Sequence, residues 1–551
     1  MKKITRRNFL QTSALAGAAA LVSGMSVAAG AAAPEAAVSA ADVDEENCIE
    51  KVFKKKVNLP DKVDRSTLPR VLITTDLEVD DINGILLTLT YADQFDIAGL
   101  VSTAGMYHFE GDGVHTLGQI TPHYKCQAGT MNGAVENASQ LKEFRPAEPK
   151  ILNRLVDVNY REDYPHLVEN NPNYPSPDEL LSVVKEGNVA FEGDVRYATE
   201  GSDWIKQCML DDDPRLLYIT HWGGFNTTAR ALLDIYDEYS NTPQWNEVLN
   251  KVVNKVRFMG SGEDNCREDT KVDELFPGLQ ASTAKNFFCY AQYFAAKLAP
   301  EKIRHFYQAE YLKDAFKFNH GRVLGEFHLM GDGQVLYGEP YIYQYGLQTY
   351  IDWKELYYQG YSTLESLAKR DRYDFDRYDW MCCQFTSNFI DIGLRQDVGN
   401  SNNHYVEVMF DELAARADWA IMDPSECNHA PVVSADQTDF TAKPGDVISM
   451  KGSAWDPDGD KLNVKWWVPM NACKYGDYTG EVINIPLVTI HIKEIVTDMP
   501  DLTVESKGYT AKFTVPTDAK VGDRFVVNME VQDVADRPMT RFAQFVITVT
   551  A

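Results

Sequence analysis

The 551-residue sequence has little cysteine, fewer basic than acidic side chains (53 against 81), and no long apolar run beyond its N-terminus. Nine cysteines without a dense regular spacing do not make a disulfide scaffold. The formal charge of −28 argues against nucleic-acid backbones and anionic membranes as partners. We find no internal repeat and, in the mature chain, no candidate for a stable membrane span.

The first residues form an export signal. The run Thr5–Leu10, with its paired arginines, precedes an Ala/Leu/Gly-rich stretch that ends in small residues near Ala28–Ala33. This arrangement is similar to a twin-arginine signal, which acts as an address. We therefore expect a signal peptide over 1–33, a linker over 34–66, and a periplasmic or extracellular protein.

The length calls for more than one domain. From Leu68 onward, short apolar runs alternate with helical stretches, a pattern typical of a parallel sheet with helices on both faces. We predict a doubly wound, mainly parallel α/β domain over 67–424. The predicted strands lie at 71–73, 97–101, 215–220 and 255–259, and predicted helices at 229–239 and 281–298.

After residue 425 the pattern changes to short alternating runs separated by turn signals. We predict an immunoglobulin-like β-sandwich over 425–551. Its Asp456–Asp460 segment looks like the start of a calcium loop, but Trp467 stands where the closing acid should be, so we predict a hairpin turn. Trp466 and Trp467 could stack on sugars, although neighbours in a strand face opposite sides and at least one should be core.

Four carboxylates follow the first predicted strand: Asp76, Glu78, Asp80 and Asp81. Apolar residues then recur at helical spacing from Ile82, so the acids lie at a strand-to-helix junction, an edge where parallel sheets bind ligands. Two interpretations remain open. The acids could cap the following helix, or they could share a hard cation such as Ca²⁺, which would relieve their mutual repulsion.

The spacing Thr74-x-Asp76-x-x-x-Asp80-Asp81 resembles the Asp-x-Asp-x-x-x-Asp-Asp motif of the nucleoside hydrolases, with Thr74 in its first position. More closely, residues 69–551 resemble a bacterial cellulose-binding family with a nucleoside-hydrolase-like domain and a small β domain. The other segments that carry this resemblance are Glu200–Asp203, Asp213–Arg215, Phe276–Pro277, Ala417–Trp419 and Asn428–Pro431.

The resemblance implies a calcium site. In nucleoside hydrolases, a glycine-containing segment after a strand supplies a main-chain carbonyl to calcium, and Gly223–Thr227 matches that place. The implied ligands are Asp76, Asp81, the carbonyl of Asn226 and, late in the domain, Asp332.

The resemblance also implies sugar-binding groups. Glu263, Asp264 and Asn265 either bond sugar hydroxyls or solvate a loop, and His328 either lies near the leaving group or is structural. Two departures weaken nucleoside as the substrate: Met106 replaces a ribose-contacting Asn, and Gly331 replaces the His beside Asp332.

These features support two hypotheses. The first is a secreted, calcium-dependent glycoside or N-glycoside hydrolase, in which Asp76 takes a proton from water while Asp80 and Glu78 bind hydroxyls. The second is a non-catalytic protein that binds a cellulose-like polysaccharide. A domain without any ligand is a third interpretation, although clustered acids at a sheet edge are costly to keep unpaired. The sequence identifies neither the sugar nor the oligomeric state.

Overall fold

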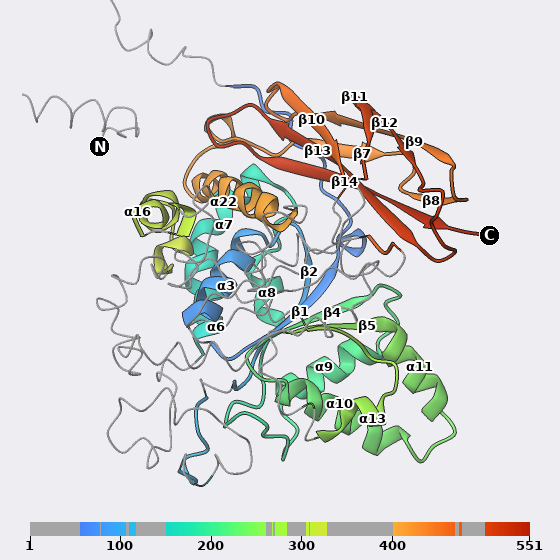
Figure 1. Ribbon diagram of the computed structural model, residues 1–551. Coiled ribbons are helices and arrows are strands. Elements are labelled where there is room, and N and C mark those ends of the chain that lie inside the picture. Colours follow the sequence, from blue (N-terminus) through green and yellow to red (C-terminus); the bar gives the residue numbers. More distant parts are fainter. Residues whose placement is uncertain are drawn as a thin grey trace, which may run out of the picture. The chain divides into compact units, whose positions relative to one another are not determined.

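The computed structural model describes residues 55–77, 79–105, 109–116, 119, 150–260, 267, 270–283, 305–307, 309–327, 401–468, 473–475 and 502–551. In chain order, a region of alternating strands and helices precedes a region whose described elements are all strands (Figure 1). None of the helices in these residues combines the length and apolarity that a membrane crossing needs.

The first region is built on a six-stranded sheet with the order β3-β2-β1-β4-β5-β6. Every neighbouring pair in it is parallel. The strand order reverses between β1 and β4, and ligands of such sheets bind at this point, beyond the carboxyl ends of the strands. The strands are β1 (Arg70–Thr75), β2 (Asp96–Ser102), β3 (Val184–Glu186), β4 (Leu217–Trp222), β5 (Val256–Gly260) and β6 (Gln280–Thr283).

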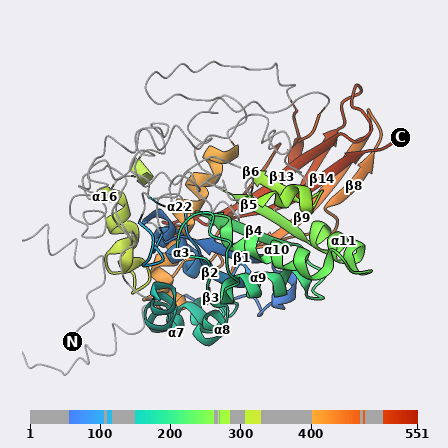
Figure 2. The ribbon, with the colours of Figure 1, turned by 90° about the horizontal axis from the view of Figure 1, so that it is seen from below.

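The doubly wound prediction is confirmed, because helices cover both faces of this sheet (Figure 1). In the view from below, α9 and α10 lie in front of the strands (Figure 2). One face is packed by α3 (Val79–Thr90), α6 (Ile151–Arg154), η4 (Leu155–Tyr160), α7 (Arg161–Asn170), α8 (Pro177–Ser182), η5 (His305–Tyr307), α16 (Ala309–Leu312), η6 (Lys313–Lys317), η7 (Leu324–Glu326) and α22 (Ser401–Trp419). The other is packed by α9 (Glu200–Leu210), α10 (Asn226–Tyr239), α11 (Trp245–Lys255) and α13 (Val272–Leu275).

The four predicted strands of this region are present, with differences at their ends and elsewhere in the sheet. β4 begins at Leu217, after a turn in which the Arg215 main-chain N–H donates to Asp213 Oδ1 at 2.9 Å. β3 was not predicted, since three residues with two charges among them carry no strand pattern. The helix predicted over 281–298 is wrong at its start, where 281–283 extend the sheet beside β5; the remainder lies outside the described residues.

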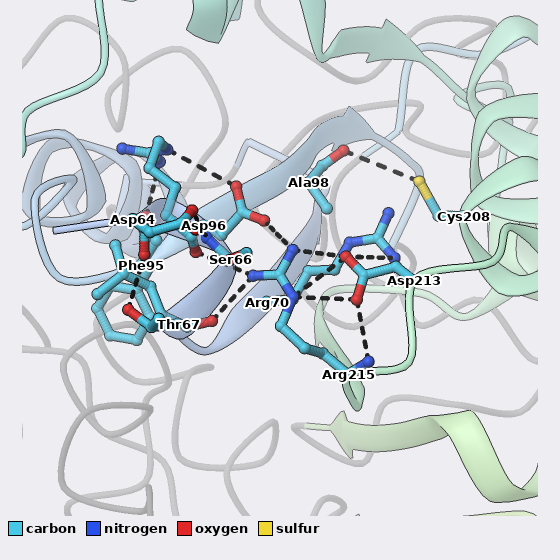
Figure 3. A network of polar contacts seen from close by, with 12 residues as sticks. Asp64, Ser66, Thr67, Arg70, Phe95, Asp96, Ala98, Cys208, Asp213 and Arg215 are labelled. Atoms are coloured by element: carbon cyan, nitrogen blue, oxygen red, sulfur yellow. Dashed lines mark hydrogen bonds and ion pairs between the residues drawn. The ribbon is translucent and has the colours of Figure 1, made fainter.

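Ion pairs close the amino edge of the sheet (Figure 3). Arg70, the first residue of β1, donates to Asp211 at 2.6 Å, and Arg215 donates to Asp96, the first residue of β2, also at 2.6 Å. The hydrogen bond from Arg215 holds the pKa of Asp213 well below its usual range. Burial opposes the ionisation of Asp211, but hydrogen bonds from Arg70 and Lys255 outweigh it and lower the pKa of this carboxyl.

A buried ion network lies near the same end of β2. Arg416 of α22 is fully buried and donates to Asp93, in the turn before β2, at 2.6 Å and to Glu412 at 2.8 Å. Arg541 donates to Glu412 at 2.6 Å. Burial opposes the ionisation of Glu412, yet Arg541 and Arg416 together lower its pKa. This arrangement meets the requirement that a buried charge be paired.

The C-terminal region is the predicted β-sandwich. Its two four-stranded sheets have the orders β10-β13-β14-β8 and β11-β12-β9-β7, and among these described strands only β14 and β8 pair in parallel. Alternate residues of both sheets fill the core, as period-two patterning requires. The strands are β7 (Val432–Ala435), β8 (Asp439–Ala442), β9 (Val447–Trp455), β10 (Leu462–Trp467), β11 (Glu505–Lys507), β12 (Thr510–Thr514), β13 (Arg524–Asp533) and β14 (Thr540–Val549).

The Asp456–Asp460 segment is a turn but does not form a hairpin, because β9 and β10 on either side of it belong to different sheets. Asp456 Oδ1 accepts the main-chain N–H groups of Asp458 and Asp460, both at 2.9 Å. Trp466 packs against Phe545 in the sandwich core, as expected for at least one member of the tryptophan pair.

The described end of the predicted linker makes specific contacts. Lys55 forms an ion pair with Asp460 at 2.9 Å, and Val63 N–H donates to Asn173 Oδ1 at 2.8 Å. Cys208, Cys427 and Cys473, the cysteines among the described residues, are buried. The bounds of the four predicted segments, 1–33, 34–66, 67–424 and 425–551, stay predictions.

Candidate functional site

The chain turns sharply where β1 ends. Asp76 N–H donates to the carbonyl of Trp222 at 3.1 Å, which carries the β1–β4 pairing one residue past the strand. Leu77 follows with a φ of 64°, a left-handed conformation that costs a non-glycine residue about 1 kcal/mol or more. The turn positions the buried Asp76 carboxylate at the carboxyl edge of the sheet.

Asp81 reaches back from the first turn of α3 to this strand end. Its Oδ1 accepts the Thr75 hydroxyl at 2.7 Å and the Asp76 N–H at 3.2 Å. The carboxylate is buried, and it lies near the positive end of α3. The structure therefore brings the Asp81 carboxylate to the main chain of Asp76, where it anchors the turn that precedes α3.

Glycines from two other strands make room for Asp76. A methyl group on Gly105, after β2, would lie 1.9 Å from Asp76 Oδ2, and one on Gly223, after β4, would lie 2.7 Å from the same oxygen. Gly223 also has a φ of 90°, which only glycine adopts without strain. The ends of β1, β2 and β4 therefore close around one carboxylate.

Asn226, which follows β4, links the segments after β2 and β3 through its side chain. Its Oδ1 accepts the Thr103 hydroxyl at 3.3 Å, and its Nδ2 donates to the carbonyl of Asn188 at 2.5 Å. Asn226 is also the first residue of α10, so its own carbonyl is directed along the helix axis. The structure thus gives the side chain a positioning role, and calcium binding by the carbonyl stays a prediction.

A cavity of about 780 Å³ opens beside this turn. Leu77, Ser102 and Glu186, at or just beyond the ends of β1, β2 and β3, line it. Charged pairs form much of its wall: Arg154 with Glu326 at 2.6 Å, and Lys185 with Glu200 at 3.0 Å. Such a wall offers both donors and acceptors, which suits a ligand rich in hydroxyl groups.

Sequence reasoning missed Gly105, Asn188 and the four charged wall residues. The only available signal for Gly105 was its place directly after an apolar strand. The charged wall residues come from separate helices, strands and loops, which no spacing rule connects. Other predicted site residues lie outside the described residues: Glu78, Glu263, Asp264, Asn265, His328 and Asp332. Asp80 lies in α3, where its side chain is not described.

Comparisons with known proteins agree with this architecture. Residues 70–349, just over half of the chain, match the family described as "Cellulose-binding Sde182, nucleoside hydrolase-like domain". Residues 447–549 match "Cellulose-binding protein Sde0182, C-terminal domain". Residues 3–23 match the twin-arginine translocation signal, which confirms the predicted export of the chain.

A solved structure shares the fold. It is that of a nucleoside hydrolase-related hypothetical protein from Saccharophagus degradans that is associated with carbohydrate metabolism. The two are 19% identical with a TM-score of 0.54, and the match covers 88% of this chain and 100% of the other. Titin domain M7 matches 22% of this chain and 97% of its own length at 11% identity, but its TM-score of 0.14 carries no argument. No curated protein matches the sequence. With both of its domains matched in order, the chain belongs to the cellulose-binding Sde182 family.

Proposed function

We propose that this protein is an exported, calcium-dependent glycosidase that hydrolyses a glycoside or N-glycoside at the carboxyl edge of its parallel sheet. The observation that carries the proposal is the enclosure of the Asp76 carboxylate by glycines of two other strand ends, beside Asp81. Neighbouring buried carboxylates favour a cation or a shared proton between them. A sheet edge that packs backbone this closely around one carboxylate suits a ligand site better than a helix cap.

The donor set fits calcium, a hard cation that prefers several oxygen ligands. Asp76 and Asp81 would hold it, with Asp332 and the Asn226 carbonyl as further predicted ligands. Bound calcium would orient a water molecule and two vicinal sugar hydroxyls.

The chain's own residues would then carry the reaction. Asp76 would accept a proton from the attacking water as the sugar acquires oxocarbenium character. Asp80 and Glu78, with Glu263, Asp264 and Asn265 from a second loop, would bond ring hydroxyls. His328 is the predicted residue nearest the leaving group. The paired charges Arg154–Glu326 and Lys185–Glu200 would hydrogen-bond the remainder of the ligand in the cavity.

A second function, carbohydrate binding without turnover, has specific support. The family description names cellulose binding, and Met106 and Gly331 stand where nucleoside hydrolases carry Asn and His. A site that keeps its acidic residues while changing the groups near the leaving base could still grip a sugar.

Calcium titration of the full chain tests the metal. We expect Asp81→Asn to weaken calcium binding about tenfold or more, because ligand charge tunes calcium affinity. The matched control is Asp237→Asn, which alters an exposed carboxylate on α10. Equal calcium affinity in wild type and Asp81→Asn would remove the metal role.

Sugar release separates the two functions. The wild type, with and without calcium, is incubated with a panel of glycosides, oligosaccharides and nucleosides, and reducing sugar is measured. We expect calcium-dependent release that Asp76→Asn abolishes. Retention on insoluble cellulose without release from any member of the panel would instead establish the binding function.

A further inference from the structure

Helix α7 and the segment before η9 (Pro424–Glu426) carry a group of metal-ligating side chains that the proposed function does not use. A ring nitrogen of His166 and one carboxylate oxygen each of Glu169 and Asp423 lie within 4.8 Å of one another. No histidine ion pair in the described part of the chain joins His166 to either acid. The three groups therefore face a common point without forming a salt bridge.

Local structure explains why these side chains converge. His166 and Glu169 are three residues apart on α7 and so lie on one face of the helix. Asp423 is the N-cap residue of η9 (Pro424–Glu426), a position where aspartate ordinarily accepts a main-chain N–H, but here its side chain makes no capping hydrogen bond. Its carboxylate is therefore available to the cluster.

Asn170 fixes the two segments to each other. Its Nδ2 donates to the carbonyls of His166 at 2.9 Å, Trp419 at 3.3 Å and Met422 at 3.0 Å. One side chain thus holds the backbone of a ligand residue on α7 and the residue directly before Asp423. A site supported in this way keeps its geometry without the metal.

The His166 ring supplies an independent observation. Its Nδ1 is shielded from solvent and has no hydrogen-bond partner. An unsatisfied buried ring nitrogen is costly, and coordination to a metal ion is one way to satisfy it. Glu169 and Asp423 reach solvent, so an ion has a path to the site.

We propose that His166, Glu169 and Asp423 bind a divalent transition-metal ion of the Zn²⁺ class. One imidazole nitrogen with two carboxylate oxygens is a set that zinc accepts, and three protein ligands leave a position for water. Zinc–ligand bonds of about 2.0–2.2 Å require the three donor atoms, which lie within 4.8 Å of one another, to move closer together when the ion binds. The ion would join α7 to the segment between α22 and η9.

Zinc titration of the full chain, with calcium present in excess to occupy the Asp76–Asp81 site, tests this inference. We expect one zinc equivalent whose affinity His166→Ala lowers by more than about 100-fold, beyond the 10–100-fold typical of losing a supporting residue. Glu169→Gln changes only an exposed side chain and should lower the affinity about tenfold. Cobalt substitution should give a visible d–d spectrum that His166→Ala abolishes.

The matched control is His115→Ala, which removes a histidine that pairs with a single carboxylate, Asp112, at 2.6 Å. It should leave zinc binding unchanged. Asp81→Asn should also retain the zinc site, and His166→Ala should retain calcium binding, so failure of either site is seen separately. Equal zinc affinity in wild type, His166→Ala and Glu169→Gln would overturn the proposal.

Discussion

The two edges of the parallel sheet use acidic side chains in opposite ways. At the amino edge, Asp96 accepts from Arg215 (Figure 3) and Asp211 accepts from Arg70, each at 2.6 Å. At the carboxyl edge, Asp81 meets a hydroxyl and a main-chain N–H, and Asp76 is enclosed by glycine backbone. Carboxylates with fixed counter-charges stabilise the fold. The described contacts of the two edges therefore differ in kind, with guanidinium groups at the amino edge and a hydroxyl, a main-chain N–H and glycine backbone at the carboxyl edge.

The largest stability effect should come from the buried network beside the amino edge. Replacing Arg416 with Met leaves Asp93 buried without its cation and leaves Glu412 paired with Arg541 alone. We expect a loss of about 3–5 kcal/mol in the free energy of unfolding, as for other broken buried pairs. Urea denaturation measures it. A loss below about 1 kcal/mol would show that water solvates Asp93 and Glu412 in the variant. The proposed difference between the two edges of the sheet would then be weaker.

At the amino edge proper, Arg70→Met removes the bidentate partner of Asp211. We expect a loss of about 1.5–3 kcal/mol, the range for hydrogen bonds to charged groups, with no change in calcium affinity. Asp76→Asn should show the reverse pattern, with lost calcium affinity and little change in the stability of the calcium-free protein. Denaturation and calcium titration of both variants provide the test. Equal losses of stability and of calcium affinity in Arg70→Met and Asp76→Asn would contradict the proposed difference between the two edges.

Gly223→Ala should damage the carboxyl edge through contact as well as strain. Gly522 has a nearly equal φ, 93° against 90°, but nothing within 4 Å of an added methyl group, whereas Gly223 faces Asp76. We expect Gly522→Ala to cost about 1 kcal/mol from backbone strain alone. Gly223→Ala should cost more and also weaken calcium binding. If Gly223→Ala and Gly522→Ala changed stability and calcium affinity equally, the close contact of Gly223 with Asp76 would be unimportant.

Acid should affect the amino edge selectively. Because the pKa of Asp213 is lowered in the folded state, its contribution to stability is present above the unfolded pKa of about 3.9 and is lost as the pH falls below it. Asp213→Asn should therefore flatten the fall in unfolding free energy below pH 4. Denaturation midpoints from pH 5 to pH 2.5 measure the slope. An unchanged slope would assign acid sensitivity to other groups.

The smallest expected effect is a pH dependence of stability that is opposite in sign to that of Asp213. Burial raises the pKa of Asp163 to about 6, although main-chain N–H groups of Val323 and Arg322 oppose the shift. Between about pH 4 and 6 the folded state binds more protons than the unfolded state, so this group makes stability fall as the pH rises. Asp163→Asn should remove that component, measured as denaturation midpoints at pH 4, 5, 6 and 7. A steeper dependence in the variant would contradict the assignment.

Sequence patterns identified the strands that are buried on both faces because such strands are continuous apolar runs. Val71–Ile73 lies in the fully buried β1 for this reason. The same patterns missed β3, whose Lys185 and Glu186 face ion pairs and a cavity. They also predicted a helix where 281–283 form a strand. Small residues such as Ala281 and Ser282 suit either structure, and here the pairing with β5 makes the segment a strand.

The sequence by itself determined the export signal, the order of an α/β domain and a β-sandwich, and the acidic junction after the first strand. Each of these depends on residues close together in the chain. Only the tertiary structure brought Gly105 and Gly223 against Asp76, and His166 and Glu169 near Asp423. The glycine contacts with Asp76 depend on the order of the strands in the sheet. The cluster of His166, Glu169 and Asp423 depends on how α7 packs against the segment after α22. Local propensity does not encode long-range contacts of this kind, because their energies arise only when the whole sheet and its helices assemble.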